Sequence, residues 1–117
     1  MEEIKAGGFL PLHHNWFHIL LSLVGSEQHG YGIMQEVLER TNGDVRIWPA
    51  TLYGALQRMI ADGLIEESEE RPAPELDDAR RRYYKLTRLG RRVLDLECER
   101  LREMLRMAQR KRRLEAY

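Results

Sequence analysis

The C-terminal part of the chain carries a hydrophobic repeat that strongly limits what the chain can fold into. Apolar residues step by four, three, four and three positions, which is the spacing of a coiled-coil seam: Leu94, Cys98, Leu101, Leu105 and Ala108. This spacing predicts one long helix from about Arg88 to beyond Arg110. With 117 residues the chain suits a single domain. Because one small domain cannot cover so long a seam, we expect the helix to pair with a second copy of the chain.

The composition favours a folded protein of a reducing compartment. Hydrophobic residues make up 43% of the chain, enough for a core. A single cysteine, Cys98, rules out a disulfide within the chain and fits a cytoplasmic location. The longest apolar run, Ile19 to Val24, is too short to span a bilayer, and the first residues lack the pattern of a signal peptide. We therefore expect no membrane association.

A helix is expected near the N-terminus, from about Leu12 to Ser26. Its apolar side chains cover almost the whole circumference, so it should be buried on nearly all sides. We expect it to pack both on its own core and on a partner subunit. Together with the seam, this gives a predicted dimer interface formed by Trp16, Leu20, Leu94, Cys98, Leu101 and Leu105.

The middle of the chain has the pattern of a helix-turn-helix followed by a hairpin. A helix is expected from His29 to Thr41, then a turn at Asn42-Gly43-Asp44, a short extended bridge over 45–48, and a helix over about 49–63 that begins at Pro49. Two strands, 64–70 and 80–86, form a hairpin with a long tip, and Thr87 caps the final helix. The predicted fold is mainly α (α+β): a winged helix-turn-helix over 1–87 and a dimerisation helix over 88–117.

The helix over 49–63 has an outward face suited to DNA. Tyr53 and Gln57 are four residues apart, as are Gly54 and Arg58, so both pairs lie on the outward surface. Hydroxyls of Thr51 and Tyr53 can bond phosphates, Gln57 can read an adenine edge, and Gly54 allows close approach. The residue pattern alone fits an ordinary solvated surface equally well.

Several motifs resemble the PadR family of bacterial transcriptional regulators. The matching stretches are His29-Gly30-Tyr31-Gly32-Ile33, Pro49 to Leu56, Asp62-Gly63-Leu64-Ile65 and Arg81 to Gly90, in the family's order and spacing. The single last helix resembles the small subfamily, which lacks a separate C-terminal domain. The resemblance implies a dimeric winged-helix protein that usually represses transcription. Some family members bind drug-like or phenolic effectors, so a small aromatic molecule is a candidate partner here.

The resemblance also assigns residues to DNA. Tyr31 matches the tyrosine of the family's His-Gly-Tyr motif, which lies near the DNA backbone. Thr51 and Tyr53 match the start of the recognition helix. The basic return strand of the wing, which covers about 64–87, is matched by Arg80, Arg81 and Arg82. Lysine is frequent in the family near Gln57, so the recognition helix of this chain is less basic.

The net charge is zero, but its distribution is uneven. Seven acidic residues and one arginine lie between Glu66 and Asp78, directly opposite the arginine cluster of the expected hairpin. These acids would repel DNA, and they can pair with the arginines across the two strands. We expect both: some arginines pair with the acids and some face DNA.

The sequence contains no complete pattern for a metal or catalytic site. His14 and His18 share a helical face and His13 is adjacent, but no cysteine completes a ligand set, so no metal or cofactor is expected. Trp16 and Trp48 are candidates for lining an effector cavity between subunits, although tryptophans of this kind are more often core or interface residues. No catalytic triad or phosphate-binding glycine loop is present, which argues against an enzyme.

The sequence therefore predicts a homodimeric DNA-binding transcription regulator, a repressor by family resemblance. A two-fold dimer should bind double-stranded DNA at an inverted-repeat operator. The alternative is a winged-helix protein-interaction module that no longer binds DNA. The neutral charge, the acidic wing and the single outward cation of the recognition helix, Arg58, favour that alternative.

Overall fold

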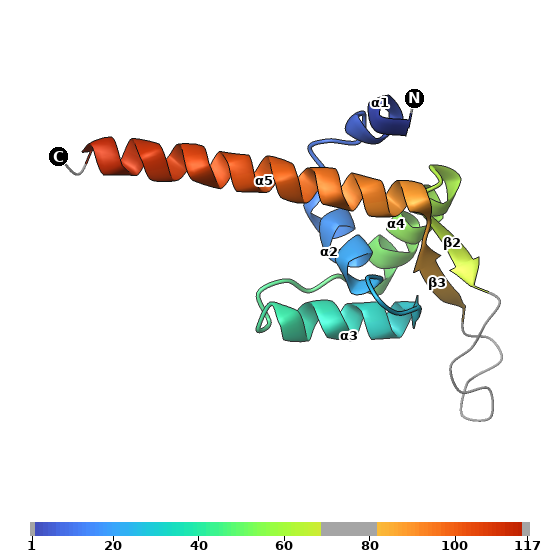
Figure 1. Ribbon diagram of the computed structural model, residues 1–117. Coiled ribbons are helices and arrows are strands. Elements are labelled where there is room, and N and C mark those ends of the chain that lie inside the picture. Colours follow the sequence, from blue (N-terminus) through green and yellow to red (C-terminus); the bar gives the residue numbers. More distant parts are fainter. Residues whose placement is uncertain (1, 69–81, 116–117) are drawn as a thin grey trace.

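The computed structural model describes residues 2–68 and 82–115 (Figure 1). Along this part of the chain the elements are α1 (Glu2–Gly7), α2 (His14–Ser22), β1 (Gln28–His29), α3 (Gly30–Arg40), α4 (Pro49–Ala61), β2 (Ile65–Ser68), β3 (Tyr83–Leu86) and α5 (Arg88–Glu115). The predicted order of three helices, a hairpin and a long helix is present, with α1 and β1 in addition. The fold is a winged helix-turn-helix, as expected.

The helix-turn-helix is set by local capping and turn chemistry. His29 caps α3, since its Nδ1 accepts a hydrogen bond from the backbone N–H of Gly32 at 2.9 Å. After α3, Asn42 and Gly43 take positive φ values of 53° and 84°, which reverse the chain as predicted. Pro49 occupies the first turn of α4, where its missing N–H costs nothing. The bridge over 45–48 has no regular secondary structure, and Trp48 at its end has an extended backbone, with φ −79° and ψ 154°.

The sheet has three strands in the order β1-β3-β2, all antiparallel. β3 pairs with β2 from Ile65 opposite Leu86 to Ser68 opposite Tyr83. The short β1 adds to the other edge of β3, which the two-stranded prediction missed. The hairpin tip, including Arg80 and Arg81, lies outside the described residues, so the expected contacts of these two arginines stay predictions.

One hydrophobic core joins the helices to the sheet. Its fully buried large side chains come from five elements and from Leu64 beside β2: Ile19, Leu20, Ile33, Val37, Leu52, Leu56, Met59, Leu64, Ile65 and Val93. α2 begins later and ends earlier than expected, because Leu23 is its C-cap and Gly25 has a φ of 83°. Fully burying one such side chain is worth about 1.5–3 kcal/mol, so this cluster dominates the stability of the fold.

α5 starts from a tight junction with the end of α4. The Thr87 hydroxyl donates to the Gly63 carbonyl at 2.5 Å and accepts from the Gly90 N–H at 3.0 Å, so Thr87 caps α5 as predicted. The Thr87 N–H also donates to the Leu64 carbonyl at 3.1 Å. A Cβ at position 90 would overlap that same carbonyl oxygen, which explains the glycine there. The junction fixes α5 directly to the start of the hairpin.

The two halves of α5 have different surroundings. Val93, Leu94 and Glu97 are buried against the rest of the chain, whereas every residue from Leu101 to Glu115 is exposed. In Figure 1 this second half projects well beyond the other helices. The long helix is present as predicted, and its exposed half carries apolar side chains; its pairing with a second copy stays a prediction.

α1 is a short helix that no sequence pattern indicated. It lies on α5, across that helix from α2 (Figure 1). Ala6 is fully buried there, and Glu3 forms a two-pronged ion pair with Arg92 of α5. Six residues are too few for a helical periodicity to stand out in a sequence.

Candidate nucleic-acid interface

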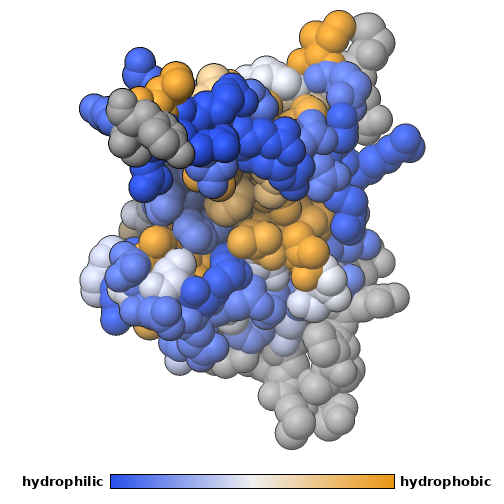
Figure 2. Space-filling view, turned by 60° about the vertical axis from the view of Figure 1, so that its left-hand side comes forward, coloured by the Kyte–Doolittle hydropathy of each residue, from blue (hydrophilic) through white to orange (hydrophobic). Residues whose placement is uncertain are grey.

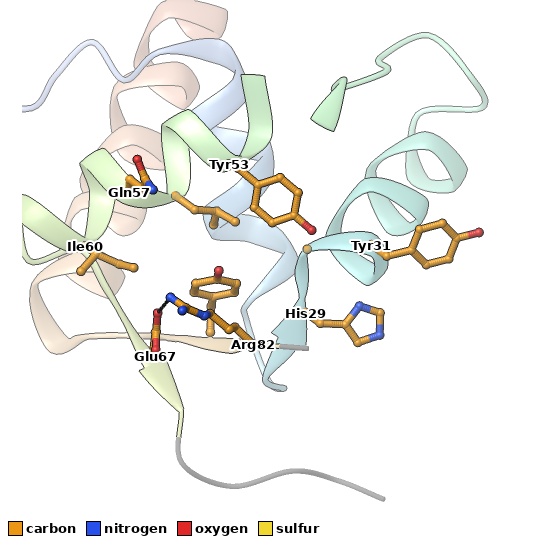
Figure 3. Close-up of a pocket in the computed structure, with 10 residues that line it drawn as sticks. His29, Tyr31, Tyr53, Gln57, Ile60, Glu67 and Arg82 are labelled. Atoms are coloured by element: carbon orange, nitrogen blue, oxygen red, sulfur yellow. Dashed lines mark hydrogen bonds and ion pairs between the residues drawn. The ribbon is translucent and has the colours of Figure 1, made fainter. Parts of the chain in front are cut away.

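A groove of about 650 Å³ lies between α4, the start of α3 and the two long strands of the sheet (Figure 3). Its lining combines aromatic rings with polar groups: His29, Gly30, Tyr31, Tyr53, Leu56, Gln57, Ile60, Glu67, Arg82 and Tyr84. Tyr31, Tyr53, Gln57 and Arg82 were predicted from the sequence as DNA contacts. The groove therefore gathers residues from three separate motifs onto one surface.

α4 separates its core face from its outward face as predicted. Leu52, Ala55, Leu56 and Met59 are buried. The outward positions are all exposed: Thr51, Tyr53, Gly54, Gln57 and Arg58. A Cβ on Gly54 would meet no atom within 4 Å, so the surface at this position is open. Ile60 lies outside the buried face, with its side chain 37% exposed, and lines the groove.

The Tyr53 ring lies against the first residue of α3. A Cβ on Gly30 would be only 2.5 Å from the Tyr53 hydroxyl oxygen and 2.8 Å from the nearest ring carbon, so a larger residue would displace the tyrosine ring. Figure 3 shows the hydroxyl of Tyr53 directed toward the start of α3. This contact joins the His-Gly-Tyr motif to α4 and fixes the direction of the ring, while the side chain remains 46% exposed.

Tyr31 projects outward from the same end of α3. Its side chain is 56% exposed, and its ring lies nearly parallel to that of His29, with centroids 6.4 Å apart. The His29 ring also meets the Tyr83 ring edge-on at 5.2 Å. The sheet and the capping hydrogen bond thus fix His29, and its ring lies beside that of Tyr31 at the edge of the groove (Figure 3).

The cations of the described part of the hairpin are paired with acids. Arg82 Nη1 lies 3.1 Å from Glu67 Oε1, inside the groove, and Lys85 Nζ lies 3.6 Å from Glu66 Oε1. Both pairs are well exposed, so each contributes little to stability. Of the three arginines predicted to contact DNA from the wing, the one that the structure describes has an acidic partner.

Tyr84 lines the groove beside this ion pair. Burial raises the pKa of its hydroxyl, and the negative charge of Glu67 raises that pKa further. His29, Ile60, Glu67 and Tyr84 were not predicted as groove residues, because their place depends on how α3, α4 and the sheet meet.

The predicted dimer residues divide into two groups. Leu20 and Leu94 are 0% and 5% exposed and belong to the chain's own core, so we remove them from the predicted interface. Leu101 and Leu105 are 39% and 56% exposed on the projecting half of α5, and Trp16 and Cys98 are half-buried. Figure 2 shows apolar atoms gathered in a hollow between α5 and α3, the region where α2 lies in Figure 1.

The histidines near the N-terminus have structural roles. His13 caps α2 through its Nδ1, and the His14 and His18 rings meet edge-on at 4.8 Å. Among the described residues no group of three potential metal ligands occurs. Burial lowers the pKa of His18, and the nearby His14 and Arg40 lower that pKa further. Arg40 donates to the His18 carbonyl at 3.0 Å and so ties α3 to α2.

Two residues just before α4 were not assigned to DNA from the sequence. Trp48 is 62% exposed and is the N-cap residue of α4. The guanidinium carbon of Arg46 lies 5.1 Å from the centre of the Trp48 ring. No ring contact joins Trp48 to Trp16 in the described structure. The effector cavity considered above would lie between two copies of the chain, so the role of these tryptophans in it stays a prediction.

Comparison with known proteins decides the family. Residues 19–96 match the transcriptional regulator PadR-like family. The chain belongs to this family. PadR-like proteins are transcription regulators, which confirms the expected class over an enzyme. The matched range runs from α2 into α5 and includes the whole described groove.

Individual PadR relatives agree with this assignment. The transcriptional regulator Rv3488 of Mycobacterium tuberculosis is 37% identical over 76% of this chain and 77% of its own length. A PadR family regulator from Clostridium difficile has a TM-score of 0.69 at 25% identity, over 84% of this chain and 97% of that one. Bacillus subtilis PadR, solved in complex with operator DNA, shares the fold with a TM-score of 0.60 at 21% identity, over 73% of this chain and 45% of that one.

The described helices include none that is long and apolar enough to cross a membrane. The longest, α5, has 28 residues and carries charged side chains along its whole length.

Proposed function

We propose that this PadR-like protein is a homodimeric repressor that binds double-stranded DNA in the bacterial cytoplasm. The observation that carries the proposal is the exposed face of α4, which lies beside the groove and forms one surface with Tyr31 of α3 and with Arg82, the residue before β3. A solved complex of a protein with this fold, Bacillus subtilis PadR, contains operator DNA. That supports the same kind of ligand here.

α4 is the proposed recognition helix in the major groove. Gln57 and Arg58 are long enough to reach base edges, and the open surface over Gly54 allows the DNA to come close. Thr51, Tyr53 and Tyr31 offer hydroxyls to the phosphates on either side. Arg82 extends the surface toward the wing, with its charge largely neutralised by Glu67.

The proposed dimer forms through the projecting half of α5. Leu101, Met104, Leu105 and Met107 are between 39% and 56% exposed there, and a second copy would cover them. Half-exposed apolar side chains of α2, including Trp16 and Phe17, supply a further apolar surface beside α5. We keep residues 88–117 as the dimerisation helix, with its first turns belonging to the core of the 1–87 domain.

Two-fold symmetry then predicts how the two half-sites of the operator are arranged. Each α4 has 13 residues and can read only a few base pairs in one groove. Both copies are needed for adequate specificity, so the half-sites should be inverted repeats with centres about 34 Å apart. A small aromatic effector bound between the subunits would release the DNA by changing that separation.

The test is a gel shift with the DNA upstream of the protein's own gene. We expect wild-type protein to bind, and Tyr53→Ala to weaken binding by about 1–3 kcal/mol with the fold unchanged by circular dichroism. Footprinting should protect two inverted half-sites. One asymmetric site, or equal binding to a single half-site, would contradict the proposed arrangement.

A sedimentation experiment tests the dimer separately. Leu101→Glu with Leu105→Glu should give monomers, because the charges would be buried without partners. Arg110→Glu is the matched control, since this residue lies about half a turn around the helix from Leu101. A wild-type protein that sediments as a monomer at micromolar concentration would overturn the homodimer.

A protein-interaction module is the second candidate. The observation in its favour is the pairing of Arg82 and Lys85 with acids, which leaves that part of the wing little net charge for DNA. The two candidates differ in how binding depends on salt. DNA binding should weaken steeply as salt rises, because phosphate contacts release counterions. Failure to bind any promoter fragment even at low salt would favour the protein-interaction module.

A further inference from the structure

The unassigned pair of Arg46 and Trp48 is exposed at the start of the recognition helix. A tryptophan that is 62% exposed is a large apolar surface to leave in water. The Arg46 guanidinium, 5.1 Å from the ring centre, covers one face of the indole and is held there by attraction to the aromatic face. The stack thus holds a positive charge in a defined place on the surface.

The place of this stack matters for DNA. Helix-turn-helix proteins insert the N-terminal end of the recognition helix into the major groove, so the residues just before that end face the sugar-phosphate wall. Arg46 lies three residues before Pro49, the first residue of α4. The guanidinium itself lies 5.1 Å from the ring centre of Trp48, the N-cap residue of α4, so the charge stays beside the end of the helix.

In the part of the chain that the structure describes, the cations near α4 are not in ion pairs, in contrast to the cations on the wing. Arg82 and Lys85 each have a carboxylate within ion-pair distance. Among the residues that the structure describes, no ion pair involves Arg46 or Arg58, which stand before and near the end of α4. On and beside α4, these two cations can therefore contact phosphate without the loss of an ion pair.

We propose that Arg46, held on the face of Trp48, binds a DNA backbone phosphate beside the N-terminal end of α4. Arg46 is the contact, and Trp48 is a positioning residue that acts through it. This inference rests on the proposed DNA binding and adds a site that the sequence motifs did not indicate. In this proposal the cations that contact phosphate lie on the recognition helix and in the loop before it, and not on the wing.

The experiment measures promoter affinity over a salt series for wild type and Arg46→Gln. Each lost phosphate contact lowers the slope of log affinity against log salt by about 0.9, so a dimer should lose about 1.8. Between 50 and 200 mM salt that slope corresponds to roughly a tenfold change in affinity. Arg91→Gln, an equal charge change at an exposed site on α5, should keep the wild-type slope.

Trp48 is tested by substitution and by its own fluorescence. Trp48→Ala should lower both affinity and slope, whereas Trp48→Phe, which keeps an aromatic face for the guanidinium, should restore most of both. The tryptophan emission of the wild type should change when promoter DNA is added, and Trp48→Phe, which leaves Trp16 as the one tryptophan, should lose that change. A purely structural role for Trp48 would leave the salt slope unchanged.

The outcomes distinguish a failure of DNA binding from a failure of the Arg46 phosphate site. If wild type binds no promoter DNA at any salt, the proposed function fails and this inference fails with it. If wild type binds and Arg46→Gln binds with the same affinity and slope, DNA binding stands and the Arg46 site is wrong. A loss of dimer on Arg46→Gln without a change in slope would place the stack at a protein interface and would equally overturn the proposal.

Discussion

Neutralising Glu67 should strengthen DNA binding. Its carboxylate lies in the groove, 3.1 Å from the Arg82 guanidinium, and both side chains are exposed, at 48% and 71%. In the proposed complex a phosphate that approaches Arg82 from the open side meets this negative charge behind the cation. Glu67→Gln keeps the shape and removes the charge.

The magnitude follows from the geometry. With the phosphate and the carboxylate on opposite sides of the guanidinium, the two negative groups lie about 6 Å apart. Two unit charges at this distance in water repel by about 0.7 kcal/mol, hence about 1.4 kcal/mol for the two half-sites of a dimer. The variant should therefore bind about tenfold more tightly at very low salt. Near 0.15 M salt, where the screening length is about 8 Å, the gain should fall to about threefold.

The assay is fluorescence anisotropy with labelled promoter DNA at several salt concentrations. Glu66→Gln is the control, because Glu66 pairs with Lys85 and does not line the groove. Its affinity should rise less than that of Glu67→Gln. Weaker binding by Glu67→Gln would refute the reasoning, since it would mean that Glu67 orients Arg82 for the phosphate instead of competing with it.

Three further predictions concern the stability of the fold. Gly90→Ala should lower the free energy of unfolding by about 1–3 kcal/mol in thermal denaturation, because the new Cβ overlaps a backbone carbonyl. Gly54→Ala, whose Cβ meets open space, should raise that free energy by about 0.5–1 kcal/mol. Equal effects of the two variants would refute the steric argument. Thr87→Val should cost about 1–2 kcal/mol, since it removes the α5 cap and a bond to the preceding turn; a cost near zero would mean that water replaces both bonds. Because the folded-state pKa of His18 is lowered, protonation favours the unfolded chain, so stability should be full above the ordinary pKa near 6.5 and fall as pH drops below it; His18→Gln should reduce this pH dependence in melts at pH 7.5 and pH 5.

The helices of the core were predictable because each obeys a local rule. Apolar spacing defined α4 and α5, and turn residues marked the boundary after α3 at Asn42 and Gly43. The outward face of α4 followed from the same spacing, so Tyr53 and Gln57 were placed correctly on the surface.

Features that depend on three-dimensional contact were not predictable in this way. β1 has two residues and exists only because β3 offers it a free edge. Leu20 looked available to a partner, since α2 is apolar on nearly every side, but α2 packs on α3 and α5 and Leu20 keeps no exposed surface. The stack of Arg46 on Trp48 likewise depends on the path of the loop before α4, which has no periodicity to reveal it.

The junction at Thr87 gives the proposed dimer a mechanical property. Since Thr87 bonds to Gly63 and Leu64 while capping α5, the long helix and the end of the recognition helix turn together as one rigid lever. Leu105 lies 17 residues along α5 from Arg88, about 25 Å from this joint. In a two-fold dimer each helix takes half of a change in the crossing angle, so a change of about 5° would move each recognition helix by about 1 Å and change their separation by about 2 Å. Substitutions where the two α5 helices cross would therefore change the half-site separation that the dimer prefers, while the base-reading side chains of α4 stay unchanged.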